Sequence, residues 1–178
     1  MSVERILDPR LRERVVSAEH AASLIQPGET VAMSGFTGSG YPKAVPQCLA
    51  QRIEQAHGRG EEFRINLLTG ASTAPELDGA LAKVDGIAMR MPFQSDPDAR
   101  KRINAGKLDY LDIHLSHVAQ HVWFGFYNEI DTAVVEVSAI HADGSLVPST
   151  SAAATSRVRP RRSGTSRCAS SRTRCIPT

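Results

Sequence analysis

The chain has 178 residues, of which 41% are hydrophobic and 22% are charged. These proportions are typical of a folded globular protein and exclude a fully disordered or collagen-like chain. No apolar run approaches the roughly 18 residues of a membrane span. The first five residues lack the basic and apolar regions of a signal peptide. We therefore expect a cytoplasmic protein with no membrane partner.

The net charge of +2 hides two different pieces of chain. Residues 152–178 contain seven arginines and no acidic residue, whereas residues 1–151 hold all 19 acidic and 14 basic residues. This larger body therefore carries a net charge of −5. Binding to nucleic acid needs clustered positive charge. We expect no nucleic-acid partner for the body.

Helical and strand patterns alternate along the body. Apolar residues three and four apart, with Ser17 and Pro97 at helix starts, indicate helices. The expected helices are residues 18–25, 43–57, 75–84, 96–105 and 111–126. The expected strands are residues 30–36, 63–68, 87–91 and 131–140, followed by a turn at 142–145 into 146–147. This alternation predicts an α/β fold whose parallel sheet is covered by helices on both faces.

Two glycine-rich bends follow the first two strands. They should lie at the carboxyl edge of the sheet, where such folds bind ligands. Their N–H groups could hold a carboxylate or a developing oxyanion, although a strand-to-helix connection that binds nothing is an equal alternative. The first bend matches neither the phosphate loop GxxxxGK[ST] nor GxGxxG. The candidate binding residues are Gly35, Phe36, Thr37, Gly38, Ser39, Gly40, Gly70, Ala71, Ser72 and Thr73.

Metal-ligating residues give weaker signals. His114, His117 and His121 would share one helical face, but the glutamate of an HExxH motif is absent, so we expect no metal site. Three cysteines form neither a disulfide framework nor a metal-ligand spacing. Cys48 is best interpreted as a small apolar core residue.

Other polar residues have structural and functional interpretations. Glu136 lies in an apolar strand and needs a partner; we favour a pair with an arginine over a role as a site acid. Lys43, after the first bend, could meet an anionic ligand, but a solvated lysine is commoner. An aromatic cluster is expected in the core or at an interface. Its members are Trp123, Phe124, Phe126 and Tyr127.

Several segments, taken in their order along the chain, resemble segments of a known protein family. They read SGFTGSGYPKAVP, LLTGASTAPELDG, INAG and HLSHVAQ. Together they resemble the acetyl-CoA hydrolase/transferase family, which includes succinyl-CoA:acetate CoA-transferases of class I, over residues 5–151. The resemblance implies a NagB/RpiA/CoA-transferase-like domain that acts on short acyl-CoA thioesters and small carboxylates in acetate metabolism. It implies coenzyme A as a substrate, no resident cofactor, and a possible homo-oligomer.

The resemblance also implies a mechanism. A glutamate attacks the thioester, giving an acyl-glutamyl anhydride and then a glutamyl-CoA thioester. The two bends would line the acyl or carboxylate side of the cleft. The family's nucleophilic glutamate and main CoA-binding glycine loop belong to its second half, and none of the ten glutamates here matches that motif. We predict no catalytic residue in this chain, and expect an inactive N-terminal fragment. A non-catalytic module that binds a carboxylate or a partner is the alternative.

Residues 152–178 depart from the family pattern. They are rich in arginine and serine and contain no Leu, Phe, Trp, Tyr or Met. We expect an incomplete domain over residues 1–151 and a disordered basic tail. Our hypothesis is a frameshift near residue 152 in GC-rich coding sequence. A genuine basic arm for RNA or anionic surfaces is the alternative.

Overall fold

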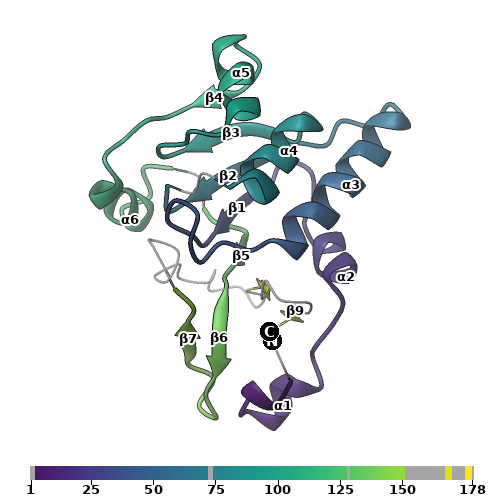
Figure 1. The fold of residues 1–178 in the computed structure, drawn as a ribbon, viewed down its shortest axis with the longest axis vertical. Coiled ribbons are helices and arrows are strands. Elements are labelled where there is room, and N and C mark those ends of the chain that lie inside the picture. Colours follow the sequence, from purple (N-terminus) through teal and green to yellow (C-terminus); the bar gives the residue numbers. More distant parts are fainter. Residues whose placement is uncertain (1–2, 72–73, 128, 151–166, 170–174, 178) are drawn as a thin grey trace.

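The main sheet is the centre of the fold. The computed structural model describes residues 3–71, 74–127, 129–150, 167–169 and 175–177. Among them the sheet order is β4-β3-β2-β1-β5-β8-β9, and β4 to β5 run parallel. The strands are β1 (Thr30–Met33), β2 (Ile65–Thr69), β3 (Ile87–Met91), β4 (Asp109–Tyr110), β5 (Thr132–Val134), β8 (Arg167–Ala169) and β9 (Cys175–Pro177). The predicted parallel α/β fold is confirmed (Figure 1).

The carboxyl-terminal strands lie within the region predicted as a tail. β8 runs parallel to β5, and β9 runs antiparallel to β8. The other residues of the predicted tail, beyond residue 151, lie outside the described residues. Ser72 and Thr73 of the second bend also lie outside them.

Four of the five expected helices begin within one residue of the predicted position. The helices are η1 (Val3–Arg5, 3-10), α1 (Pro9–Arg12), α2 (Ala18–Ser23), α3 (Ala44–Gly58), η2 (Pro75–Gly79, a π turn), α4 (Ala80–Lys83), α5 (Pro97–Asn104) and α6 (Leu115–Trp123). Ser17 caps α2 by accepting a hydrogen bond from the His20 N–H, and the Asp96 carboxylate caps α5 in the same way. No helix of the described part of the chain is both long and apolar enough to span a membrane.

Alternate side chains of β1 and β2 enter two cores. Val31 and Met33 pack into the larger core with α2, α3 and α4, whereas Ala32 and Leu68 pack with Val118 of α6 on the opposite face. This alternation follows from the two-residue period of a strand. Helices therefore cover both faces of the sheet, as predicted.

The expected strand over residues 131–140 is wrong in one respect: it is two strands in two sheets. β5 belongs to the parallel sheet, whereas β6 (Val137–Ile140) pairs with β7 (Leu146–Pro148) in an antiparallel hairpin. The ladder ends at Val134 because the Glu136 N–H donates to the side-chain Oγ of Ser34 and not to a strand carbonyl. The hairpin therefore extends away from the sheet (Figure 1).

The expected helix over residues 111–126 is shorter, because both ends carry stop signals. His114 is the N-cap of α6, and its side chain accepts a hydrogen bond from the Ser116 N–H. At the other end Gly125 adopts a φ of +72°. The Phe126 N–H donates to the His121 carbonyl, which is the bond of a Schellman motif.

One ion pair is completely buried in the sheet. Arg90 of β3 donates from Nε to Oδ1 of Asp78 at 2.7 Å, and both side chains are 0% exposed. Arg90 also donates from Nη1 to the Pro92 carbonyl. Asp78 belongs to η2, the helical turn that follows the second bend. The pair therefore fixes that turn against β3.

Removing one member of this pair should be costly. We expect Asp78→Ala to lower the free energy of unfolding by about 3–5 kcal/mol, because the Arg90 charge stays buried without its carboxylate. The double variant Asp78→Leu/Arg90→Met should lose much less, because neither charge remains. Urea denaturation of the whole chain measures both. Arg59→Ala, which breaks an exposed pair with Glu61, is the control and should leave stability unchanged. A loss below about 1 kcal/mol for Asp78→Ala would contradict this prediction.

Candidate functional site

The structure brings the two predicted bends together. The Thr37 N–H of the first bend donates to the Ala71 carbonyl of the second at 3.0 Å. Thr37 has a φ of +50° and Ala71 a φ of +63°. Non-glycine residues rarely adopt this left-handed region, and such strain gathers at functional sites. Two strained residues thus face each other at the carboxyl ends of β1 and β2.

The first bend is a tight and closed turn. Phe36 and Ser39 exchange two main-chain hydrogen bonds, of 2.9 and 3.0 Å. Gly35 has a φ of +125°, and a Cβ at this position would lie 2.6 Å from Cβ of Tyr41. Only glycine allows both this conformation and this close approach. The bend therefore folds back onto Tyr41.

A buried hydroxyl closes the base of this bend. Ser34 is 0% exposed. Its Oγ donates to the Gly40 carbonyl at 2.7 Å and accepts from the Glu136 N–H at 2.8 Å. Its own N–H donates to the Val134 carbonyl. Ser34 therefore joins β1, the end of the bend and the β5–β6 junction, although the sequence analysis did not single it out.

Tyr41 connects the first bend to the helix after the second. Its hydroxyl donates to Oε2 of Glu76 at 2.8 Å. Burial, together with the neighbouring Glu76 carboxylate, raises the pKa of Tyr41 to about 12. The phenol is therefore a neutral donor at physiological pH. The sequence analysis missed Tyr41 and Glu76; the only signal was their presence in the two family segments.

Lys43 and Glu136 form an ion pair beside Tyr41. Nζ of Lys43 lies 3.5 Å from Oε2 of Glu136 and 4.0 Å from the centroid of the Tyr41 ring. The Glu136 side chain is only 10% exposed, whereas that of Lys43 is 48% exposed. The ion pair seen for Glu136 among the described residues is with Lys43, and not with the expected arginine. Lys43 is correspondingly more than a solvated surface residue.

The remaining bend residues differ in their availability. Gly35, Gly40, Gly70 and Ala71 are buried, whereas residues 36–39 are exposed. The N–H groups of Phe36, Thr37 and Ser39 already donate to carbonyls of the bends. Gly38, at the tip, has an N–H with no such partner among the described residues. A ligand at this edge would therefore meet the Gly38 amide and the exposed Phe36 ring.

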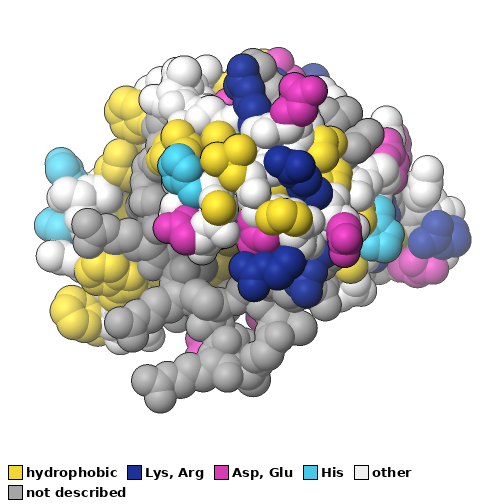
Figure 2. Space-filling model, turned by 90° about the horizontal axis from the view of Figure 1, so that it is seen from below, with side chains coloured by type: hydrophobic (Ala, Val, Ile, Leu, Met, Phe, Trp, Pro, Cys, Tyr) yellow, Lys and Arg dark blue, Asp and Glu magenta, His cyan; other side chains and the backbone are white. Residues whose placement is uncertain are grey.

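The aromatic cluster divides between core and surface. Tyr127 packs against the core under α6. Trp123, Phe124 and Phe126 are 50%, 71% and 66% exposed, so for these three the expectation of an interface fits better than that of a core. α6 itself contains no Asp, Glu, Lys or Arg. Figure 2 shows hydrophobic and histidine side chains together at the end of the molecule where α6 lies.

The predicted histidines lie along α6 and its cap. The rings of His117 and His121 are stacked with centroids 6.0 Å apart, and His114 lies 5.7 Å from His117. Within the described ranges, no three His, Cys, Asp or Glu side chains are grouped as a metal site. Cys48 packs partly against the larger core.

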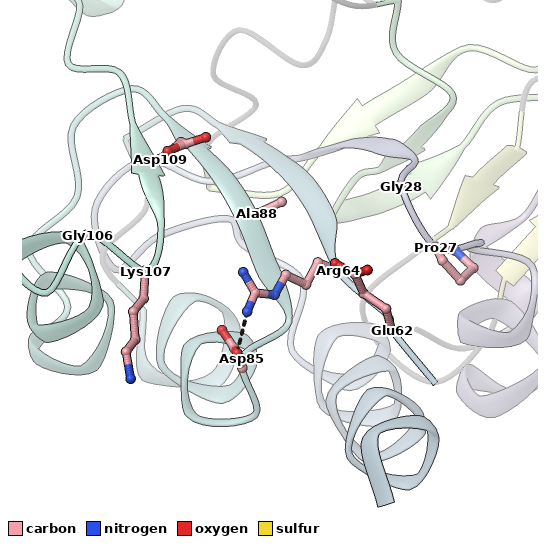
Figure 3. Close-up of a pocket in the computed structure, with 9 residues that line it drawn as sticks. All are labelled: Pro27, Gly28, Glu62, Arg64, Asp85, Ala88, Gly106, Lys107 and Asp109. Atoms are coloured by element: carbon pink, nitrogen blue, oxygen red, sulfur yellow. Dashed lines mark hydrogen bonds and ion pairs between the residues drawn. The ribbon is translucent and has the colours of Figure 1, made fainter. Parts of the chain in front are cut away.

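A pocket of about 790 Å³ lies at the opposite edge of the sheet, near the amino ends of the strands (Figure 3). Arg64 extends there to Asp85, whose second oxygen accepts from Arg102, each at 2.5 Å. These charged groups already satisfy one another. Ligands of parallel α/β sheets bind at the carboxyl ends, so the bends are the stronger candidate site.

Known proteins match most of the length of this chain. The family described as "Acetyl-CoA hydrolase/transferase N-terminal domain" matches residues 7–158. A succinyl-CoA:acetate CoA-transferase of Clostridium kluyveri is 44% identical over 147 residues, which cover 83% of this chain and 27% of that protein. An acetyl-CoA hydrolase of Saccharomyces cerevisiae is 36% identical over 160 residues, covering 83% of this chain and 30% of that protein. The chain thus spans less than a third of the length of these relatives.

Solved structures show the same fold at low sequence identity. RipA from Yersinia pestis superposes with a TM-score of 0.56 at 18% identity, covering 82% of this chain and 33% of RipA. An acyl-CoA transferase from Escherichia coli O157:H7 superposes with a TM-score of 0.54 at 13% identity, covering 74% of this chain and 36% of that one. The match of the family to most of this sequence, on a fold of this type, shows that the chain belongs to the acetyl-CoA hydrolase/transferase family, in its N-terminal domain.

Proposed function

We propose that the two joined bends form the acyl side of a site that processes short acyl-CoA thioesters, in acetate metabolism. The observation that carries this proposal is the hydrogen bond between Thr37 and Ala71, two non-glycine residues held at positive φ. Such strain persists only where the surrounding structure imposes it. The bond lies at the carboxyl edge, where this class of sheet binds ligands.

In this proposal the chain contributes binding groups and no nucleophile. Among the described carboxylates, Glu136 is the strongest candidate for an attacking group, because its main chain is bonded to the first bend through Ser34. Its side chain is nearly buried and paired with Lys43. An attacking carboxylate must reach the thioester carbon, and a buried, paired carboxylate is poorly placed for that. The nucleophilic glutamate would come from the part of the family to which this chain does not align.

A partner-binding module is the second candidate function. Three exposed aromatic side chains follow one another at the end of an uncharged helix, at Trp123, Phe124 and Phe126. Exposed aromatic residues in a surface depleted of charge are typical of the centre of a protein interface. Cytoplasmic location and association with further copies stay predictions from the sequence.

A single added methyl group can test whether the first bend belongs to the binding site. We expect Gly35→Ala to weaken binding of acetate and of the acetyl thioester of N-acetylcysteamine at least tenfold, because Cβ would overlap Tyr41 and distort the bend. NMR titration of the whole chain measures the binding, and circular dichroism measures the fold. Gly58→Ala, at the open end of α3 where a Cβ meets nothing within 4 Å, is the matched control. Equal affinities in the two variants would count against the bends as the binding site.

The absence of a nucleophile is equally testable. We expect the purified chain to release no thiol from acetyl-CoA above the buffer rate, with or without added succinate, in an assay with a thiol-reactive dye. Glu136→Gln should behave identically. If the unsubstituted chain turns over acetyl-CoA and Glu136→Gln abolishes this turnover, the chain does supply a nucleophile. Glu136 would then be identified as the attacking group.

A further inference from the structure

We propose that the pocket at the amino ends of the strands is a second binding site, which takes a small zwitterion. Such a ligand carries one carboxylate and one ammonium group, joined by a short aliphatic chain. This inference goes beyond the proposed function, because the pocket and the two bends lie at opposite edges of the sheet. It uses none of the groups that form the bends.

The pocket has room for a ligand of this size. Its volume of about 790 Å³ lies within the range of small-molecule sites, which is roughly 300–1,000 Å³. Small residues form part of its wall, at Gly28, Ala88 and Gly106. A Cβ added at Gly28 or Gly106 would meet nothing within 4 Å. The wall therefore leaves the charged side chains of the pocket accessible to a ligand.

Main-chain hydrogen bonds hold the pocket in shape. The Gly28 N–H donates to the Arg64 carbonyl at 2.7 Å, which joins the loop before β1 to β2. The Lys107 N–H donates to the Arg102 carbonyl at 3.0 Å, and Gly106 between them has a φ of +64°. This arrangement is a Schellman motif at the end of α5. The backbone that carries Lys107 is therefore fixed before a ligand binds.

Two arginines share one carboxylate on one side of the pocket. Nη2 of Arg64 and Nη1 of Arg102 donate to the two oxygens of Asp85, each at 2.5 Å. Two guanidinium groups and one carboxylate leave a charge of +1 on this cluster. Within the described part of the chain, Nε and Nη1 of Arg64 donate to no protein group. Figure 3 shows the Arg64 guanidinium between Asp85 and Ala88, inside the pocket. The cluster can therefore still bind an anionic group.

Three further charged side chains line the pocket, at Glu62, Lys107 and Asp109. All three residues are exposed. Among the residues that the structure describes, their side chains take part in no hydrogen bond or ion pair. Figure 3 shows the Lys107 side chain extending away from Asp109. Free groups of both signs are thus present in one pocket without neutralising each other.

These remaining charges determine the class of ligand. Two positive charges are left, on the arginine cluster and on Lys107, and two negative charges, on Glu62 and Asp109. A simple anion would be attracted by the first two and repelled by the other two, and a simple cation the reverse. A zwitterion meets both sets. Its carboxylate accepts from Lys107 and from the planar fork of Arg64, which matches a carboxylate in shape. Its ammonium group donates to one of the two free carboxylates.

The test uses zwitterions of increasing length, namely free glycine, β-alanine, γ-aminobutyrate and ε-aminocaproate. Each is titrated into the whole chain, and NMR follows the amide signals of Gly28 and Gly106 in the pocket. The acid and the amine of the same chain length, such as butyrate and butylamine, each carry one of the two charges. We expect the best zwitterion to bind about fivefold more tightly than its matched acid or amine, which is the contribution of one exposed ion pair. High salt should reduce this difference.

Substitutions assign the two ends of the ligand to residues. Lys107→Met should weaken binding of the zwitterion and of the acid, and strengthen binding of the amine. The double variant Glu62→Gln/Asp109→Asn should weaken binding of the zwitterion and of the amine, and strengthen binding of the acid. Lys101→Met and Glu54→Gln, which remove exposed charges of α5 and α3 outside the pocket, are the matched controls and should change none of these affinities.

The outcomes separate this inference from the proposed function. If the matched acid or amine binds in the pocket as tightly as the best zwitterion, the assigned ligand class is wrong. If Lys107→Met and the double variant bind the zwitterion like the unsubstituted chain, or if no ligand shifts the signals of Gly28 and Gly106, the pocket is not a site of this kind. The proposed function stands in each case, because binding at the bends is followed separately through the amide of Gly38.

Discussion

The buried hydroxyl of Ser34 is the contact on which the carboxyl edge of this protein depends. It donates to the Gly40 carbonyl and accepts from the Glu136 N–H, while its own main chain continues the ladder with β5. A hydroxyl can do both because it is at once a donor and an acceptor. Without it a buried carbonyl and a buried amide would each lose their hydrogen bond, at a cost of about 1–3 kcal/mol each. The closed bend and the departure of the hairpin from the sheet therefore have one common cause.

This constraint holds the first bend in a closed conformation. The bend is closed at its base by Ser34, at its tip by the Phe36–Ser39 turn, and at its side by Ala71. Preorganised main-chain groups are effective where charge develops on a substrate, because they need no rearrangement. In the polar pocket at the other edge, Arg64 is already paired with Asp85.

The sequence predicted the layers well because their signals are local. The apolar period of residues 43–57, the cap at Ser17 and the helix start at Pro97 depend only on near neighbours, and the structure reproduces them. The predictions failed where a distant residue decides. No residue between positions 131 and 140 indicates that the Ser34 hydroxyl ends the strand. The pair between Glu136 and Lys43 seen among the described residues was likewise not expected, because such a choice of partner is made by the fold and not by spacing.

The two bends were predictable in position but not in detail. Glycines after two strands were sufficient to locate both bends, since the carboxyl ends of parallel strands share one edge. The sequence could not reveal that Thr37 and Ala71, rather than glycines, hold the strained conformations. It also gave no reason to link Tyr41 to Glu76, which are 35 positions apart. Contacts of that kind depend on the packing of α3 beside the second bend.

The ion pair between Arg90 and Asp78 has a dynamic consequence. Because both groups are completely dehydrated, the turn that carries Asp78 cannot separate from β3 without exposing or isolating two charges. A protein opens locally where separating two elements requires the least free energy. Separating this turn from β3 requires a large amount. The turn after the second bend and the third strand should accordingly unfold as a single cooperative unit.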